Sequence, residues 1–139
     1  MERPTQRRRA RELVLKTLYA AETEVDEPGH LFDAITEGEG LPERQKEFAR
    51  ALFLSTWEHR GWADQQISDL AENWRLDRIA IIDLMILRMA LIEMERFPDI
   101  PIGVVINEAI ELAKSFSTAE SASFVNGILD RFAKRVRNV

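Results

Sequence analysis

Hydrophobic residues recur along the whole chain at the three- and four-residue spacing of amphipathic helices, without sustained strand-like alternation. The first stripe runs from Ala10 to Ala21 and predicts a helix over about Thr5–Thr23. Six more stripes predict a short helix with Leu31, Phe32 and Ile35, one from Pro42 to near Gly61, one with Ala63 to Trp74, one over about Arg78–Glu95, one opened by Pro101, and one with Val125 to Val136. The pattern therefore predicts an all-α fold of about seven helices.

The helix expected over residues 78–95 differs from the others because it is apolar on almost every side. Such a helix is buried by several neighbours, so we expect it at the centre of its bundle, with Asp77 as its N-cap. Asp83 is an unusual charge in this helix, and it is either an interface residue or a partner of Arg88 or another base.

Local signals define the connections between these helices. Asp26 to Gly29 predict a turn, and glycines at positions 38 and 40 end the short helix before Pro42 opens the next. Residues 117–120, Ser-Thr-Ala-Glu, fit a capping box in which Ser117 accepts from the backbone and Glu120 reaches back. Asn126-Gly127 is a hairpin dipeptide, but the helical stripe continues through it, so we interpret it as helix. Gly127 then costs about 1 kcal/mol relative to alanine, which indicates close approach of another backbone.

The helices fall into two halves with an expected boundary near Gly61. Residues 1–60 predict an N-terminal helical subdomain and residues 61–139 a C-terminal one. Because the connections are short, we expect the two small bundles to pack together as one domain.

The 139-residue composition excludes several kinds of chemistry. Cysteine is absent, only His30 and His59 could supply imidazole, and no glycine-rich phosphate loop occurs. The acid pairs Glu93/Glu95 and Glu108/Glu111 are more typical of a solvated helix face than of a catalytic site. We therefore expect neither an enzyme nor a bound cofactor or metal. The longest apolar stretch, residues 79–94, is interrupted by charges, and no signal peptide is evident, so we expect a soluble, cytoplasmic protein.

The net charge of −5 conceals two basic ends. Residues 1–16 contain six bases and two acids, and residues 131–139 contain four bases and no acid. Arg7, Arg8, Arg9 and Arg11 surround the start of the first helix and cannot all face the core, which favours an anion-binding surface. Charged ends that only keep the chain soluble explain the same pattern.

Phe124 is a second candidate for binding, because it lies about 100° from Val125 at the edge of the last apolar stripe. An aromatic ring there can stack on an unpaired base, or it can be a peripheral core residue.

Four sequence blocks resemble the NusB family of transcription antitermination factors. The blocks are Arg7-Arg8-Arg9-Ala10-Arg11-Glu12 with Leu18-Tyr19, Ile86-Leu87-Arg88-Met89-Ala90 with Glu93 and Ile100-Pro101, Ile106 to Lys114, and Phe124-Val125-Asn126-Gly127-Ile128-Leu129-Asp130. They appear in the family's order and cover nearly the whole chain. The resemblance implies two small helical bundles, binding of single-stranded boxA RNA in ribosomal RNA leader transcripts, a heterodimer with the ribosomal protein NusE, and loading onto the RNA polymerase antitermination complex.

The resemblance also implies roles for particular residues. Arg7, Arg8, Arg9, Arg11, Glu120 and Phe124 correspond to RNA-binding positions, and Tyr19 and Asp83 to positions at the NusE surface. Three residues depart from the family pattern: Ser117 replaces a frequent glycine, Ser123 a frequent basic residue, and Asp83 the longer glutamate of some members. Two alternatives are a domain related to the N-terminal part of a ribosomal RNA cytosine methyltransferase and a helical adaptor without an RNA role. A monomer and a homodimer both agree with the sequence.

Overall fold

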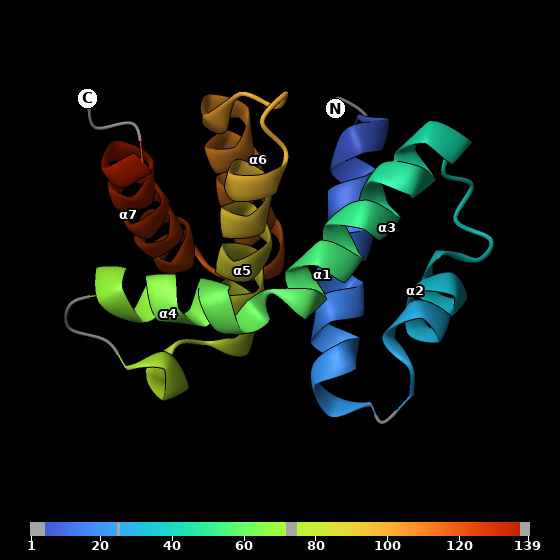
Figure 1. Ribbon diagram of the computed structural model, residues 1–139, viewed down its shortest axis with the longest axis horizontal. Coiled ribbons are helices and arrows are strands. Elements are labelled where there is room, and N and C mark those ends of the chain that lie inside the picture. Colours follow the sequence, from blue (N-terminus) through green and yellow to red (C-terminus); the bar gives the residue numbers. More distant parts are fainter. Residues whose placement is uncertain (1–4, 25, 72–74, 137–139) are drawn as a thin grey trace. The chain divides into compact units, whose positions relative to one another are not determined.

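The regular structure in the computed structural model is entirely helical over the residues it describes, which are 5–24, 26–71 and 75–136. This confirms the all-α expectation. The elements in this part of the chain are α1 (Gln6–Thr23), α2 (Pro28–Thr36), α3 (Glu43–Glu58), α4 (Arg60–Leu70), the 3₁₀ turn η1 (Leu76–Arg78), α5 (Ile81–Arg96), α6 (Ile102–Phe116) and α7 (Ala119–Val136) (Figure 1). The chain divides into two compact units, Met1–Glu58 and His59–Val139.

In the first unit, α1 packs against α2 and α3, and α2 packs against α3. Thr5 caps α1 by accepting a hydrogen bond from the backbone N–H of Arg8 at 3.0 Å. The rings of Phe32 and Phe53 stack in the core with their centroids 5.9 Å apart.

The boundaries of α2 and α3 correct the expected turns. Pro28 and Gly29 form the first turn of α2 instead of a loop, because proline at the first helical position needs no N–H partner. After α2, Gly38 and Gly40 adopt φ values of 77° and 71°, which accounts for glycine at both positions. Gly61 does not end α3; it lies in the first turn of α4.

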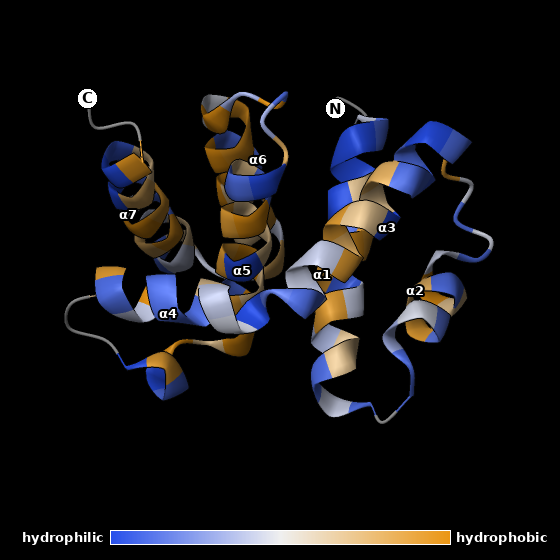
Figure 2. Cartoon of the chain, in the orientation of Figure 1, coloured by the Kyte–Doolittle hydropathy of each residue, from blue (hydrophilic) through white to orange (hydrophobic). Residues whose placement is uncertain are grey.

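In the second unit, α5 is the central helix and packs against α4, α6 and α7. Every residue from Asp83 to Met94 is buried, and Figure 2 shows α5 coloured as hydrophobic over most of its length. The buried run includes Arg88, whose guanidinium donates two hydrogen bonds to the Asp64 carboxylate on α4, at 2.7 and 2.8 Å. The expected central position of this helix is confirmed.

The start of α5 differs from the expectation. Residues Leu76–Arg78 form a 3₁₀ turn, Ile79 is extended, and α5 begins at Ile81 with Ala80 at the N-cap. Asp77 is therefore not the cap; its carboxylate pairs with Arg75 at 3.2 Å. Trp74, which we expected in the stripe of the fourth helix, lies outside the described residues.

Two glutamates expected on solvated faces are buried instead. Glu93 is buried on α5, and Glu108 is buried on α6 beside Val105, Ala109 and Leu112. The helices α5 and α6 pack closely against each other. Sequence spacing alone therefore does not show which of their acidic residues face solvent.

Gly127 lies inside α7, as we expected from the helical stripe. The expected close backbone is not found in the part of the chain that the structure describes: a Cβ at Gly127 meets only the Arg131 Nη2 atom, at 3.7 Å. Gly127→Ala should therefore raise the free energy of unfolding by about 0.5–1 kcal/mol, because alanine restricts the unfolded chain and fits the helix. Urea denaturation measures the change, and a less stable variant would show that α7 needs glycine here.

Candidate nucleic-acid interface

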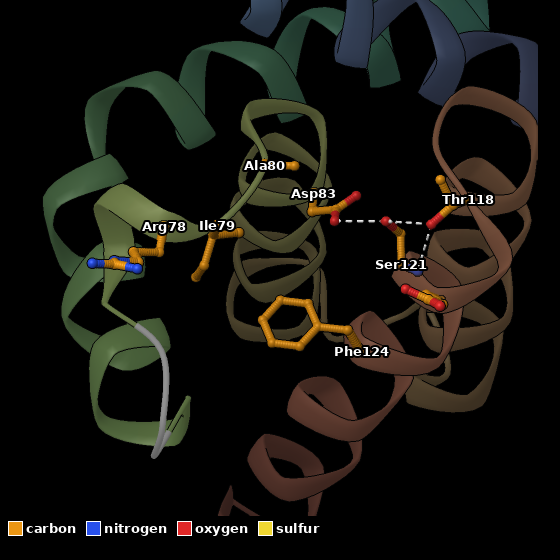
Figure 3. Close-up of a pocket in the computed structure, with 8 residues that line it drawn as sticks. Arg78, Ile79, Ala80, Asp83, Thr118, Ser121 and Phe124 are labelled. Carbon is orange, nitrogen blue, oxygen red and sulfur yellow. Dashed lines mark hydrogen bonds between the residues drawn. The ribbon is translucent and has the colours of Figure 1, made fainter.

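A pocket of about 260 Å³ lies in the second unit, between the start of α5 and the start of α7. It is lined by Arg78, Ile79, Ala80, Asp83, Thr118, Glu120, Ser121 and Phe124 (Figure 3). Drug-sized ligands occupy sites of roughly 300–1,000 Å³, so this pocket suits a smaller group such as one nucleobase. Three of the expected site residues, Asp83, Glu120 and Phe124, therefore come together here.

The Phe124 ring forms one wall of this pocket. Its neighbour Val125 is fully buried in the core, whereas Phe124 is half-buried, as expected for the edge of the apolar stripe. Figure 3 shows the ring extending from α7 toward the segment that carries Arg78 and Ile79. Glu120 is exposed one turn earlier on the same helix. A ring in this position offers an apolar surface on which a flat base can stack.

Asp83 is the deepest polar residue of the pocket, with only 6% of its surface exposed. Its Oδ2 atom accepts a hydrogen bond from the Ser121 hydroxyl at 2.7 Å. Among the described residues, none donates to its Oδ1 atom, although that atom is buried. Pairing with Arg88, one of the two explanations considered for this charge, is not observed, because Arg88 binds Asp64.

The first turn of α7 is held by hydroxyl groups and not by the expected capping box. Thr118 is the residue that caps the helix, because its Oγ1 atom accepts from the Ser121 backbone N–H at 3.0 Å. Ser117 ends α6, and its hydroxyl contacts the Ser121 hydroxyl at 2.8 Å. Glu120 is exposed at the pocket and is not part of this cap.

The arginines at the start of α1 lie in the first unit, and two of them pack on one ring. The guanidinium carbons of Arg7 and Arg11 lie 3.9 and 5.4 Å from the centroid of Phe48. Arg7 also donates to the Gln45 side chain. Arg11 is only 4% exposed, so it is the buried member of the cluster, whereas Arg7, Arg8 and Arg9 are half-buried.

Arg8 and Arg9 are more exposed than Arg11. Arg9 donates to the carbonyl of Glu39 at 2.6 Å, and its guanidinium lies 3.7 Å from the Glu39 carboxylate. Both side chains are half-buried. They are better placed than Arg11 to meet a phosphate.

In the second unit, three of the four bases at the C-terminal end have structural partners, and Arg137 lies outside the described residues. Arg131 donates to the carbonyl of Leu70, Arg135 donates to Gln66, and Lys134 pairs with Asp130 at 3.1 Å. These contacts hold α7 to α4, or stay within α7, so the charge asymmetry there does not require an anionic ligand.

Tyr19 and Asp83, the expected partner-surface residues, differ in accessibility. Tyr19 on α1 is 46% exposed, whereas Asp83 is almost fully buried. An exposed aromatic residue is typical of a protein interface. Their roles in partner binding stay predictions.

Sequence reasoning did not single out Arg78 or Ser121, which also line the pocket. The apolar stripe places Arg78 only as the first residue of a helix, and Ser121 is one of several hydroxyl residues near the capping signal. The only sequence feature that could have indicated a role for Arg78 in the pocket is its position, as a basic residue just before a strongly apolar helix. No local signal connects Ser121 with Asp83, which lies 38 positions earlier.

The described residues provide neither a metal-ion cluster nor a membrane-spanning helix. They contain no group of three histidine, cysteine or acidic side chains arranged to hold a metal ion. Among the helices of this part of the chain, none has both the length and the apolar character needed to cross a membrane.

Comparison with known proteins identifies the family. Residues 8–134 match the model of the NusB family. The transcription antitermination protein NusB of Trichlorobacter lovleyi is 47% identical over 124 residues, covering 89% of this chain and 87% of the relative. The protein of the same name from Symbiobacterium thermophilum is 42% identical over 131 residues, covering 88% and 86%.

Solved structures agree with this assignment. The structure of T. maritima NusB has 39% identity, a TM-score of 0.86, and covers 96% of this chain and 93% of that chain. A crystal structure of the antitermination factors NusB and NusE with double-stranded RNA has a TM-score of 0.84 over 94% of this chain and 97% of that chain. Its 24% identity supports the fold alone. The chain therefore belongs to the NusB family of transcription antitermination proteins.

Proposed function

We propose that this protein binds single-stranded boxA RNA of ribosomal RNA leader transcripts together with NusE, and helps to load the antitermination complex onto RNA polymerase in the cytoplasm. The observation that carries the proposal is the half-buried Phe124 ring, which forms the wall of a base-sized pocket at the start of α7 in a NusB-family chain. No catalytic step is part of the proposal.

The pocket favours a base over a phosphate as its occupant. Asp83 and Glu120 bring two carboxylates to it, against the single guanidinium of Arg78. A phosphate would be repelled by the two carboxylates, whereas a neutral base can stack on Phe124 and donate hydrogen bonds from its edge. This supports recognition of an unpaired nucleotide.

Contacts with the RNA backbone are assigned to the first unit. Arg8 and Arg9 are half-exposed at the start of α1, and guanidinium groups bind phosphate oxygens in a bidentate manner. Arg7 and Arg11 contribute through their packing on Phe48, which orders this end of the helix. Tyr19 is the candidate contact with NusE, because its ring is exposed on α1.

The proposal is tested by measuring the affinity of the protein for a boxA RNA oligonucleotide and for a scrambled one, with and without NusE, at two salt concentrations. We expect tighter binding of boxA than of the scrambled RNA, a gain in affinity with NusE, and weaker binding at higher salt. Equal affinity for both RNAs in the presence of NusE would contradict the proposal.

The phosphate contacts have their own test. Arg8→Ala should weaken binding of boxA and scrambled RNA alike, and should reduce the slope of log affinity against log salt by up to about 0.7, the value for one lost contact on a single strand. Arg50→Ala is the matched control, because Arg50 is an arginine of the same unit that pairs with Asp33. If both variants change the slope equally, the effect belongs to net charge and Arg8 makes no specific contact.

A further inference from the structure

We propose that Asp83 is a positioning residue of the RNA site: through Ser121 it fixes the first turn of α7, and thereby the place of the Phe124 ring. This inference rests on the proposed function, because the role of the Phe124 ring in RNA binding belongs to that proposal. The hydrogen bond between Asp83 and Ser121 is observed independently of it. Asp83 belongs to α5 and Ser121 to α7, so the 2.7 Å hydrogen bond between their side chains joins two helices (Figure 3).

The directions of the hydrogen bonds follow from counting protons. The Ser121 hydroxyl has one proton and donates it to Asp83. The Ser117 hydroxyl, 2.8 Å away, must therefore donate to the Ser121 oxygen, as the Thr118 hydroxyl does at 3.1 Å. Thr118 in turn accepts from the Ser121 backbone N–H. Three hydroxyls at the junction of α6 and α7 are thus oriented toward one carboxylate.

Asp83 is well suited to act as a fixed point. It begins the run of twelve consecutive buried residues in α5, the helix that packs against α4, α6 and α7. A hydrogen bond to a carboxylate is about twice as strong as one between neutral groups, and 2.7 Å is within the short range of such bonds. The α5 helix therefore holds the start of α7 through a strong, directional contact.

Phe124 follows Ser121 by three residues, so both lie on nearly the same face of α7. A small rotation of the first turn of α7 would move the ring out of its place in the pocket wall. The burial of Asp83 also explains why it acts within the protein: an aspartate with 6% of its surface exposed offers a partner protein almost no contact area.

The first measurement reads the position of the ring without RNA. Protein carrying 4-fluorophenylalanine at position 124 gives one ¹⁹F resonance that reports the surroundings of that ring. Asp83→Ala and Ser121→Ala should shift or broaden this resonance in the same way, whereas Asp83→Asn, which keeps an acceptor for Ser121, should restore most of it. Asp64→Ala is the matched control, since Asp64 also binds a buried residue of α5 but has no hydrogen bond to α7 among the described residues. An unchanged resonance in Asp83→Ala overturns the proposal.

The second measurement is a double-mutant cycle on RNA affinity. Asp83→Ala and Ser121→Ala should each weaken boxA RNA binding by roughly three- to tenfold, which is within the lower part of the range for coupled neighbours. Neither should weaken it further when Phe124 is already alanine, because the ring through which they act is gone. A loss that persists without Phe124, or a loss confined to NusE binding, contradicts the positioning role and makes Asp83 a direct contact.

The two measurements separate this inference from the proposed function. If the substitutions shift the ¹⁹F resonance but neither the wild type nor any variant binds boxA RNA, the positioning role of Asp83 is supported and the proposed RNA function is wrong. If the wild type binds boxA RNA and the substitutions leave the ¹⁹F resonance unchanged, the proposed RNA function is supported and the positioning role of Asp83 is wrong.

Discussion

Phe124→Ala is expected to weaken binding of boxA RNA by roughly 1–3 kcal/mol, or about 5- to 150-fold in the dissociation constant. The ring forms a wall of the pocket at the start of α7 and would lose its stacking surface for a base. The salt dependence of binding should change little, because a neutral ring releases no counterion. Equilibrium binding at several salt concentrations measures both quantities.

The control for this variant is Phe116→Ala. Phe116 is 37% exposed on α6 of the same unit and does not line the pocket, so its loss should leave the RNA affinity unchanged. The melting temperature of each variant must be measured first, because a peripheral core phenylalanine also contributes to stability. If Phe124→Ala lowers the melting temperature and leaves RNA affinity intact, the ring is only a core residue.

Asp64→Ala is expected to have the largest effect on stability, lowering the free energy of unfolding by about 3 kcal/mol. The substitution leaves the Arg88 guanidinium without the carboxylate that accepts two of its hydrogen bonds, and the Arg88 side chain is only 10% exposed. Chemical denaturation monitored by circular dichroism measures the loss. Asp77→Ala removes an exposed pair with Arg75 and should cost less than about 1 kcal/mol. An equal loss of unfolding free energy in the two variants would show that the buried Asp64–Arg88 pair contributes no more to stability than the exposed Asp77–Arg75 pair.

The helical framework could be predicted because its signals are local. Apolar spacing identified all the α-helices of the described residues, and the all-round apolar character of the helix expected over residues 78–95 identified the central one. The edge position of Phe124 also follows from spacing alone, since Val125 defines the buried side of α7. Helix boundaries were predicted less accurately, because Pro28 begins a helix and Gly61 lies inside one. Proline and glycine occur both at helix ends and within the first turn, so the residue type alone does not define the boundary.

The polar contacts of the site could not be predicted because they join distant positions. The partners of Asp83 and Arg88, Ser121 and Asp64, are 38 and 24 residues away. Arg11 resembles the half-buried arginines before it in the sequence, yet its side chain is buried with the guanidinium over the Phe48 ring of another helix. The capping signal at residues 117–120 contained two adjacent hydroxyl residues, and only the packed structure distinguishes Thr118 as the cap.

The structure also changes how the partner surface should be tested. Asp83→Arg is not a clean test of NusE binding, because a buried arginine would disturb the second unit itself. Tyr19 is the better residue, because its exposed ring can be removed with little change to the core. Tyr19→Ala should weaken NusE binding and leave binding of RNA alone unchanged, which a pull-down and a parallel RNA titration measure.

The central claim, that an unpaired RNA base lies against Phe124, is tested most directly by photocross-linking. A boxA RNA carrying 5-iodouridine is bound to the protein with NusE, irradiated and digested with trypsin, and the cross-linked peptides are identified by mass spectrometry. Trypsin cleaves after Lys114 and Arg131, so residues 115–131 form one peptide that contains the α7 side of the pocket. We expect a cross-link in this peptide, at Phe124, that disappears in Phe124→Ala. Cross-links found only in other peptides would place the RNA elsewhere and contradict the account.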